Sequence, residues 1–359
     1  MPAPRSSAVS SKRNLPRRSF LRTAAAAGAA LASGGAPWVL AKSADAVLGQ
    51  GKFRYRVVPG WGVLDEKTPV NDCHGLARTA DGHIVLLTNH VANNVIFYDE
   101  AGKLAHKWTG PKFPGAHGLS LAPYRNKSTL FVTDLNLHTV TRFALTGQQL
   151  GEWRLPAGTG KYAKETDYRP SWTLHRADGG FYVLDGYGKD YILDYAADGT
   201  FKRLLGGPEG GIVHWGPHGG MIDTAADGAE TMLIAMSDQQ YLLRLDLDGK
   251  KLTQTDLPGG NPRQIRRFGQ HYVVAHLADN WPKDRNSRGF LSILDQNLRV
   301  VSNIAGSAPI YDATGKLLPM KHTADVFIHP HDVIANPDGS LIVAQFASGK
   351  TYPIKLERI

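Results

Sequence analysis

The sequence predicts an all-β protein, a six-bladed β-propeller whose blades each hold four strands. Short runs of valine, isoleucine, leucine, phenylalanine and tyrosine alternate with turns, and no amphipathic helix interrupts them. Asp-Gly pairs favour type I′ hairpin turns, in which both central residues have positive φ. Such pairs mark the first hairpin of four repeats, at Asp81, Asp178, Asp227 and Asp338. A second turn recurs later in the repeat, at Gly102, Gly147, Gly199 and Gly249. Two hairpins per repeat give four strands, and six repeats begin near residues 74, 117, 171, 218, 263 and 331.

Residues 1–41 have the pattern of a twin-arginine export signal. Arg17-Arg18 precedes the alanine- and glycine-rich stretch 23–36, and Val39-Leu40-Ala41 then offers small residues for a signal peptidase. The stretch is too short and too weakly apolar for a membrane span, and no later segment approaches the roughly 20 apolar residues that a spanning helix needs. We therefore expect a periplasmic or secreted protein in which residues 42–359 form one propeller domain.

Removing residues 1–41 also removes most of the net positive charge. This segment holds six basic residues and no acidic one, so the formal charge falls from +9 to +3. A nearly balanced surface gives no electrostatic basis for binding nucleic acid or an anionic membrane. We expect a monomer whose partner is a small polar substrate in the central channel. Cys73 is the single cysteine, and we expect a small buried side chain there rather than a thiolate ligand.

The first and last parts of the predicted domain must meet to close the ring. The last repeat leaves room for three strands between His331 and Ile359. The alternating run Phe53–Pro59 supplies the fourth, so that an N-terminal strand completes the last blade and covers an otherwise unpaired edge. Long loops are expected at residues 156–169, 279–288 and 307–327, and we expect them to rim the substrate entrance.

Four histidines occupy the same place in the repeat and indicate a metal site. His74, His117, His218 and His331 each open the first strand of a repeat, and first strands line the channel of a propeller. The last three fall in blades 2, 4 and 6, roughly 120° apart in a six-fold ring. Three imidazoles so placed leave an open side, as in catalytic zinc sites, although imidazole also suits copper, iron and nickel. His74 is either a fourth ligand or a polar group facing substrate.

Several segments resemble the peptidyl-α-hydroxyglycine α-amidating lyases, also called peptidylamidoglycolate lyases. These segments are His117-Gly118-Leu119-Ser120 with residues 130–140, residues 181–187, and Pro330-His331-Asp332-Val333. The resemblance implies a six-bladed propeller of the NHL-repeat kind with zinc on His117, His218 and His331. It also implies a structural calcium in the channel, held by the Asp332 carboxylate and the Leu76 and Leu119 carbonyls. The catalytic tyrosine of the family matches Tyr187.

The sequence departs from this family where the family binds its substrate. The family places one arginine after the third strand of blade 1 and another at the same point of blade 4. Here those regions read Thr88-Asn89-His90 and Ser237-Asp238-Gln239. The substrate pocket is therefore expected to differ, with Arg169 or Arg263 supplying positive charge from another direction.

Together these features predict an exported, metal-dependent propeller enzyme, of the type of a zinc-dependent carbon–nitrogen lyase with an altered substrate pocket. Tyr187 would act as general base once a metal or another cation lowers its pKa from about 10, and His74 would belong to the same catalytic site. Two other functions remain open. One is a metal-dependent hydrolase or lactonase on a sugar-derived substrate, a class whose metal sites use carboxylates and amides. The other is a non-catalytic binding or scaffold propeller.

Replacing both Arg17 and Arg18 by lysine tests the predicted export route. Because the twin-arginine signal is read through its arginine pair, we expect the variant to leave metal-loaded precursor in the cytoplasm. Immunoblots of cytoplasmic and periplasmic fractions measure this, with Arg13→Lys as the control outside the pair. Normal periplasmic accumulation of the double variant would contradict the prediction.

Overall fold

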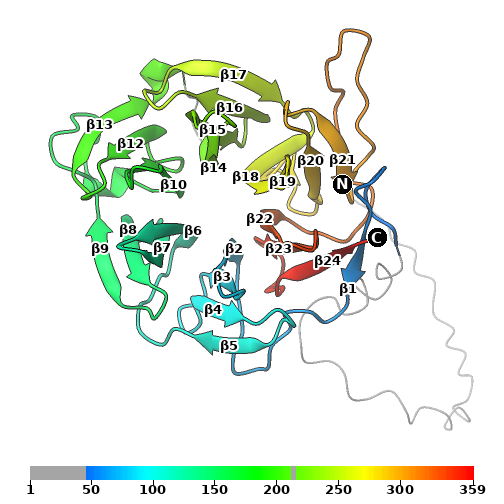
Figure 1. Ribbon diagram of the computed structural model, residues 1–359, viewed down its shortest axis with the longest axis horizontal. Coiled ribbons are helices and arrows are strands. Elements are labelled where there is room, and N and C mark those ends of the chain that lie inside the picture. Colours follow the sequence, from blue (N-terminus) through cyan, green and yellow to red (C-terminus); the bar gives the residue numbers. More distant parts are fainter. Residues whose placement is uncertain (1–45, 212–215) are drawn as a thin grey trace, which may run out of the picture. The chain divides into compact units, whose positions relative to one another are not determined.

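The computed structural model describes residues 46–211 and 216–359. The predicted export signal, residues 1–41, lies outside them. The described residues form six four-stranded antiparallel sheets, which radiate as blades around a central channel (Figure 1). The predicted six-bladed, all-β architecture is confirmed. Helical structure in these ranges is limited to the short 3-10 turns η1 (Glu165–Asp167) and η2 (Pro208–Gly210).

Each blade runs from an inner strand at the channel to an outer strand at the rim (Figure 1). The first blade holds β2 (Cys73–Arg78), β3 (Ile84–Thr88), β4 (Val95–Tyr98) and β5 (Leu104–Lys107). The second holds β6 (Ala116–Tyr124), β7 (Lys127–Asp134), β8 (Thr139–Ala144) and β9 (Gln149–Trp153). The third holds β10 (Trp172–His175), β11 (Phe181–Leu184), β12 (Tyr191–Tyr195) and β13 (Phe201–Gly206).

The remaining blades repeat this order. The fourth holds β14 (Pro217–Thr224), β15 (Glu230–Met236), β16 (Tyr241–Leu245) and β17 (Lys251–Asp256). The fifth holds β18 (Gly260–Phe268), β19 (His271–Ala278), β20 (Phe290–Leu294) and β21 (Val300–Ile304). The sixth holds β22 (Pro330–Ala335), β23 (Leu341–Gln345), β24 (Ile354–Arg358) and β1 (Tyr55–Val58).

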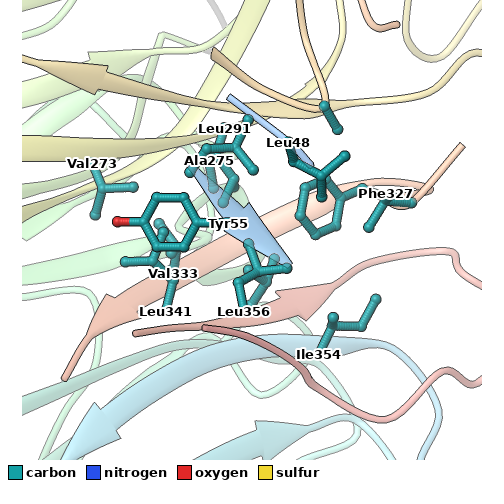
Figure 2. Packing of buried hydrophobic residues seen from close by; sticks show 14 of the residues in the cluster. Leu48, Tyr55, Val273, Ala275, Leu291, Phe327, Val333, Leu341, Ile354 and Leu356 are labelled. Atoms are coloured by element: carbon teal, nitrogen blue, oxygen red, sulfur yellow. The ribbon is translucent and has the colours of Figure 1, made fainter. Parts of the chain in front are cut away.

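Burial falls from the middle of the blade to its rim in blades 1 and 4, whereas the outer strands of blades 5 and 6, β21 and β1, stay largely buried. The second strands β3, β11 and β23 are buried along their whole length, because neighbouring blades cover both of their faces. The outer strands β5 and β17 are mostly exposed and polar. The core therefore lies between blades. Figure 2 shows one such layer, in which Tyr55 and Leu356 of blade 6 pack with Val273 and Leu291 of blade 5.

The N-terminal strand completes the last blade, as predicted. β1 pairs antiparallel with β24, with Tyr55 opposite Arg358 and Val58 opposite Lys355. The strand is shorter than the predicted run Phe53–Pro59. Pairing of β1 covers the edge of β24, which would otherwise present unpaired N–H and C=O groups.

The hairpins use a different turn from the predicted type I′. The glycine of each Asp-Gly pair has positive φ, between 82° and 94°, but the aspartates do not. In the first blade the Gly82 amide donates to the Thr79 carbonyl, and the Thr79 amide donates to the His83 carbonyl. This pattern is a three-residue loop, a type I turn followed by a glycine in the left-handed region. The prediction was wrong in turn type because one glycine satisfies the single positive φ that this longer loop requires.

The long loops divide between the channel and the outer edge. Trp281 and Pro282, from residues 279–288, reach the channel mouth. Residues 307–327 instead project at the outer edge beside β21 (Figure 1), where Met320 and Leu317 pack with Leu257. That loop does not rim the channel, contrary to expectation. Cys73 is fully buried within an apolar cluster, as expected for a small side chain. No helix in residues 46–211 and 216–359 has the length and hydrophobicity that crossing a bilayer demands.

Replacing Tyr55 by alanine tests the contribution of ring closure to stability. Tyr55 is fully buried between blades 5 and 6, so its truncation leaves a cavity. We expect the free energy of unfolding to fall by about 3–5 kcal/mol, measured as an earlier urea midpoint. Arg56→Ala, at the exposed neighbouring position of β1, is the matched control and should change stability by less than about 0.5 kcal/mol. Equal midpoints for the two variants would contradict this account.

Candidate metal centre and substrate cavity

A β-bulge at the start of the inner strand positions the side chains of the candidate site. In blades 1, 2, 4, 5 and 6 of the described propeller, the register between the first two strands shifts at this point. The residues within these shifts include His74, His117, His218, Arg263 and His331. A bulge redirects its extra side chain out of the sheet pattern. Arg263 therefore occupies in blade 5 the place that a histidine occupies in four other blades.

The four predicted histidines form one buried cluster. Ring centroids are 4.7 Å apart for His117 and His218, 4.8 Å for His218 and His331, and 4.9 Å for His117 and His331. His74 lies on the other side of the last pair, 4.8 Å from His331 and 5.2 Å from His117. The nitrogens of His74, His117 and His331 lie within 4.8 Å of one another. His117 and His331 would therefore be shared by two possible ligand sets, one completed by His218 and the other by His74.

Backbone hydrogen bonds orient three of the four rings in the same way. The Nδ1 atoms of His117, His218 and His331 lie 2.9 Å, 2.9 Å and 2.6 Å from the carbonyl oxygens of Ser171, Arg263 and His74, respectively. A carbonyl oxygen can only accept, so each Nδ1 carries the proton and each Nε2 presents a lone pair. This is the outer-shell arrangement typical of histidine metal ligands.

His74 differs from the other three histidines. Its Nδ1 is buried and has no hydrogen-bond partner among the described residues. A buried polar atom without a partner costs free energy unless a ligand satisfies it. The observation fits both predicted roles, a fourth ligand and a group facing substrate.

The cluster is uncharged at neutral pH. Burial lowers the pKa of His74 to about 3. Burial also lowers the pKa of the other three histidines well below the ordinary value, and neighbouring imidazoles and Arg263 lower these pKa values further. Neutral imidazole is the form that binds metal ions.

Tyr187 projects into the cluster from the loop that follows β11. Its hydroxyl lies 3.0 Å from Nε2 of His218 and 3.3 Å from Nε2 of His117. Burial raises the pKa of Tyr187, and the positive charges of Arg263 and Arg169 oppose that increase. The tyrosine is therefore a neutral phenol beside the Nε2 lone pairs of His117 and His218.

A buried carboxylate fixes the loop that carries Tyr187. Asp185 accepts hydrogen bonds from the Arg169 amide at 2.6 Å, the Lys189 amide at 2.7 Å and the Tyr162 hydroxyl at 2.7 Å. Burial raises the pKa of Asp185 to about 7. Gly186 is needed here because a Cβ atom would overlap the Pro217 carbonyl oxygen. The tyrosine is thus held by rigid backbone rather than by a free loop.

A cavity of about 230 Å³ opens above this cluster. Its polar walls are His74, His331, Tyr187, Arg263 and Arg285, and its apolar walls are Leu277, Trp281, Pro282 and Phe346. Of the described residues that line it, none carries a carboxylate. The cavity therefore presents positive and neutral polar groups at one side and an aromatic surface at the other.

Of the two predicted substrate-binding arginines, Arg263 lines the cavity. It is 3% exposed, and its Nε has no hydrogen-bond partner within the described ranges. The carboxylate of Asp238 lies 4.0 Å from its guanidinium. Arg169 is half-buried beside the Tyr187 loop and is not among the lining residues. A buried cation with an unpaired donor is suited to bind an anionic or carbonyl group of a ligand.

The groups that the resemblance assigns to calcium do not fit a calcium ion in this structure. The Arg266 guanidinium lies 2.7 Å from Oδ2 of Asp332, 2.9 Å from the Leu76 carbonyl and 3.5 Å from the Leu119 carbonyl. It also stacks on Trp172, 4.9 Å from the ring centre. The three predicted ligands do converge, but on an arginine cation. Arg266 was not among the predicted site residues, although its place on the inner strand of blade 5 was a signal.

No protein-family model matches this sequence, and no curated protein matches it. Solved propeller structures match over most of the chain. A streptogramin B lyase is 14% identical, with a TM-score of 0.54, over 80% of this chain and 94% of that one. A catalytically inactive histidine-to-alanine variant of virginiamycin B lyase from Staphylococcus aureus, with quinupristin, is 15% identical over 80% of each chain, with a TM-score of 0.50. Hydrazine synthase from Kuenenia stuttgartiensis is 14% identical over 84% of this chain and 99% of that one, with a TM-score of 0.50. At these identities the likeness shows the propeller fold, and the amidating-lyase type stays a prediction.

Proposed function

We propose that the protein is an exported, metal-dependent enzyme, a zinc lyase of the carbon–nitrogen type with its own substrate pocket. One observation carries the proposal. His117, His218 and His331 each bond Nδ1 to a backbone carbonyl and so keep a lone pair on Nε2, and the Tyr187 hydroxyl lies beside two of these Nε2 atoms, those of His117 and His218. A scaffold propeller has no need of this orientation. A lactonase-type metal site would need carboxylate ligands, and no carboxylate is among the described residues that line the cavity.

The donor set suits a transition ion that binds imidazole. Zinc in catalytic sites takes three protein ligands and leaves a position open. His117, His218 and His331 would hold the ion, and His74, whose Nδ1 has no hydrogen-bond partner among the described residues, would be a fourth ligand or a group facing substrate. Copper, iron and nickel accept the same donors. Such an ion, when bound, polarises a substrate oxygen or lowers the pKa of a bound water to about 7.

Tyr187 is suited to transfer a proton at this site. Its hydroxyl lies within hydrogen-bond distance of two Nε2 atoms. A substrate hydroxyl bound beside these two imidazoles would therefore lie within hydrogen-bond distance of the Tyr187 oxygen. A cation bound at the site would favour loss of the phenolic proton, so that the Tyr187 phenolate could act as general base. In a lyase step the phenolate would take the substrate hydroxyl proton, the carbon–oxygen bond would become a carbonyl, and the carbon–nitrogen bond would break. The Tyr187 hydroxyl formed in this way would then give its proton to the leaving nitrogen. Arg263 and Arg169 already oppose the rise in the pKa of Tyr187 that burial causes.

The cavity favours a small substrate without positive charge. Its volume of about 230 Å³ lies below the roughly 300–1,000 Å³ of pockets for drug-sized ligands. Arg263 orients a carboxylate or carbonyl through its unpaired donor, while Trp281 and Phe346 cover an apolar part. Arg169 acts on the site through Tyr187 rather than by contact with the substrate.

Alanine substitution of single histidines tests the metal centre. Each of His117→Ala, His218→Ala and His331→Ala should weaken zinc binding more than about tenfold, because losing a ligand costs at least as much as losing an outer-shell partner. Metal analysis of purified protein and competition with a chromogenic chelator measure this. The controls are His83→Ala and His271→Ala, which remove histidines far from the channel. Stoichiometric, tight zinc in all three variants would show that the assignment is wrong.

Tyr187→Phe tests the proton-transfer role because it removes a single oxygen. We expect turnover to fall about 10²- to 10⁴-fold with unchanged metal content. Tyr191→Phe, whose hydroxyl bonds Glu209 away from the channel, is the matched control. The substrate panel holds hydroxy acids, amides, lactones and a peptide ending in α-hydroxyglycine.

The α-hydroxyglycine peptide in that panel tests whether the substrate pocket differs from that of the amidating lyases. We expect slow cleavage of the α-hydroxyglycine peptide, because neither family arginine is present at its usual position. Efficient cleavage would instead identify a simple amidating lyase. Complete lack of turnover across the panel, with metal bound, would favour the scaffold function.

A further inference from the structure

A single arginine joins four blades that meet at the channel. Arg266 lies on β18 of blade 5, and its guanidinium reaches Asp332 on β22, the Leu76 carbonyl on β2 and the Leu119 carbonyl on β6. Each of these contacts is close in sequence to a histidine of the cluster. Asp332 follows His331 directly, and Leu76 and Leu119 each lie two residues after a histidine.

We propose that Arg266 is a built-in cation that takes the place of a channel calcium and positions the histidine-bearing strands. The positioning part rests on the proposed metal centre. The clamp, by which we mean the contacts of Arg266 with Asp332, Leu76 and Leu119, does not rest on the metal centre, because these contacts are present in the structure. It follows that the protein needs no calcium for stability and that loss of Arg266 creates a site for a divalent cation.

The charges and geometry of the oxygen set match a guanidinium better than a calcium ion. The set described here offers one carboxylate and two carbonyls, whereas calcium takes six to eight oxygens and several negative charges in tight sites. One arginine neutralises one aspartate. Its fork also matches the carboxylate in bidentate fashion, with Nε 3.1 Å from Oδ1 and the terminal nitrogen 2.7 Å from Oδ2. The Trp172 ring supplies a cation–π contact to the same guanidinium.

Burial makes the cation necessary. Asp332 is fully buried, and an ionised carboxylate without a partner is strongly destabilising in the interior. Its Oδ2 also accepts the Leu76 amide at 2.8 Å, and its Oδ1 accepts the Val333 amide at 2.8 Å. Without Arg266 the same oxygens would remain pre-arranged around an empty space. A divalent cation from solution could then restore both charge balance and strand positions.

The test compares wild type, Arg266→Ala, Arg266→Lys and the control Arg267→Ala. Arg267 is the next residue of β18, but it pairs with Asp223 at a partly exposed position. The first readout is the thermal midpoint after removal of calcium and after addition of millimolar calcium chloride. Wild type and Arg267→Ala should not respond to calcium. Arg266→Ala should melt at least about 5 °C lower and should recover half or more of that loss with calcium.

The second readout is the visible absorption spectrum of Co²⁺ bound at the histidine cluster. We expect Arg266→Ala to bind Co²⁺ at least about tenfold more weakly with an altered spectrum, and calcium to restore both. Arg266→Lys keeps the charge without the fork, so its Co²⁺ affinity should lie between those of wild type and alanine. If Arg266→Ala folds poorly, refolding with and without calcium replaces the midpoint, and calcium-dependent refolding is the expected result.

Different outcomes would overturn different parts of the inference. A wild type that requires calcium would refute the built-in cation, as would an Arg266→Ala protein that does not respond to calcium. Unchanged Co²⁺ binding in Arg266→Ala would refute the positioning role and leave an ordinary buried ion pair. A wild type that binds no Co²⁺ at all would refute the proposed metal function, while calcium recovery of Arg266→Ala would still establish the clamp.

Discussion

The chemistry of the channel depends on one backbone feature, the bulge that opens the inner strand of five blades in the described propeller. A regular strand would alternate its side chains between the two faces of the blade, where neighbouring blades bury them. The bulge instead turns one residue toward the axis. The ring thereby collects imidazoles from four blades and a guanidinium from the fifth, and the carbonyls of the same region fix the imidazole orientation.

The channel holds two groups of side chains with different electrostatic character. Asp332 and Arg266 neutralise each other. The imidazoles of the histidine cluster are neutral, and Arg263 beside them lies 4.0 Å from the Asp238 carboxylate, at the limit of an ion pair. The cavity above therefore favours groups that accept hydrogen bonds or carry negative charge.

The sequence predicted the parts of this structure that repeat. Blade number, blade boundaries, the closing strand and the convergence of four histidines all follow from the spacing of turns and apolar runs. The errors concern features that spacing does not encode. The turn type depends on how many residues the loop holds, and the placement of residues 307–327 depends on outer-edge packing of Met320. Arg266 was missed because its partners lie in three other blades, far away in sequence.

The closing strand also determines when the histidine cluster can exist. β1 is the first of the described strands to be synthesised, and its partner β24 is the last. Blades 1 to 5 can form one after another as the chain emerges, because each is contiguous in sequence. Blade 6 cannot, and it carries His331 together with the aspartate that Arg266 requires. The histidine cluster therefore becomes complete only when blade 6 closes, after the last of the described strands has been made.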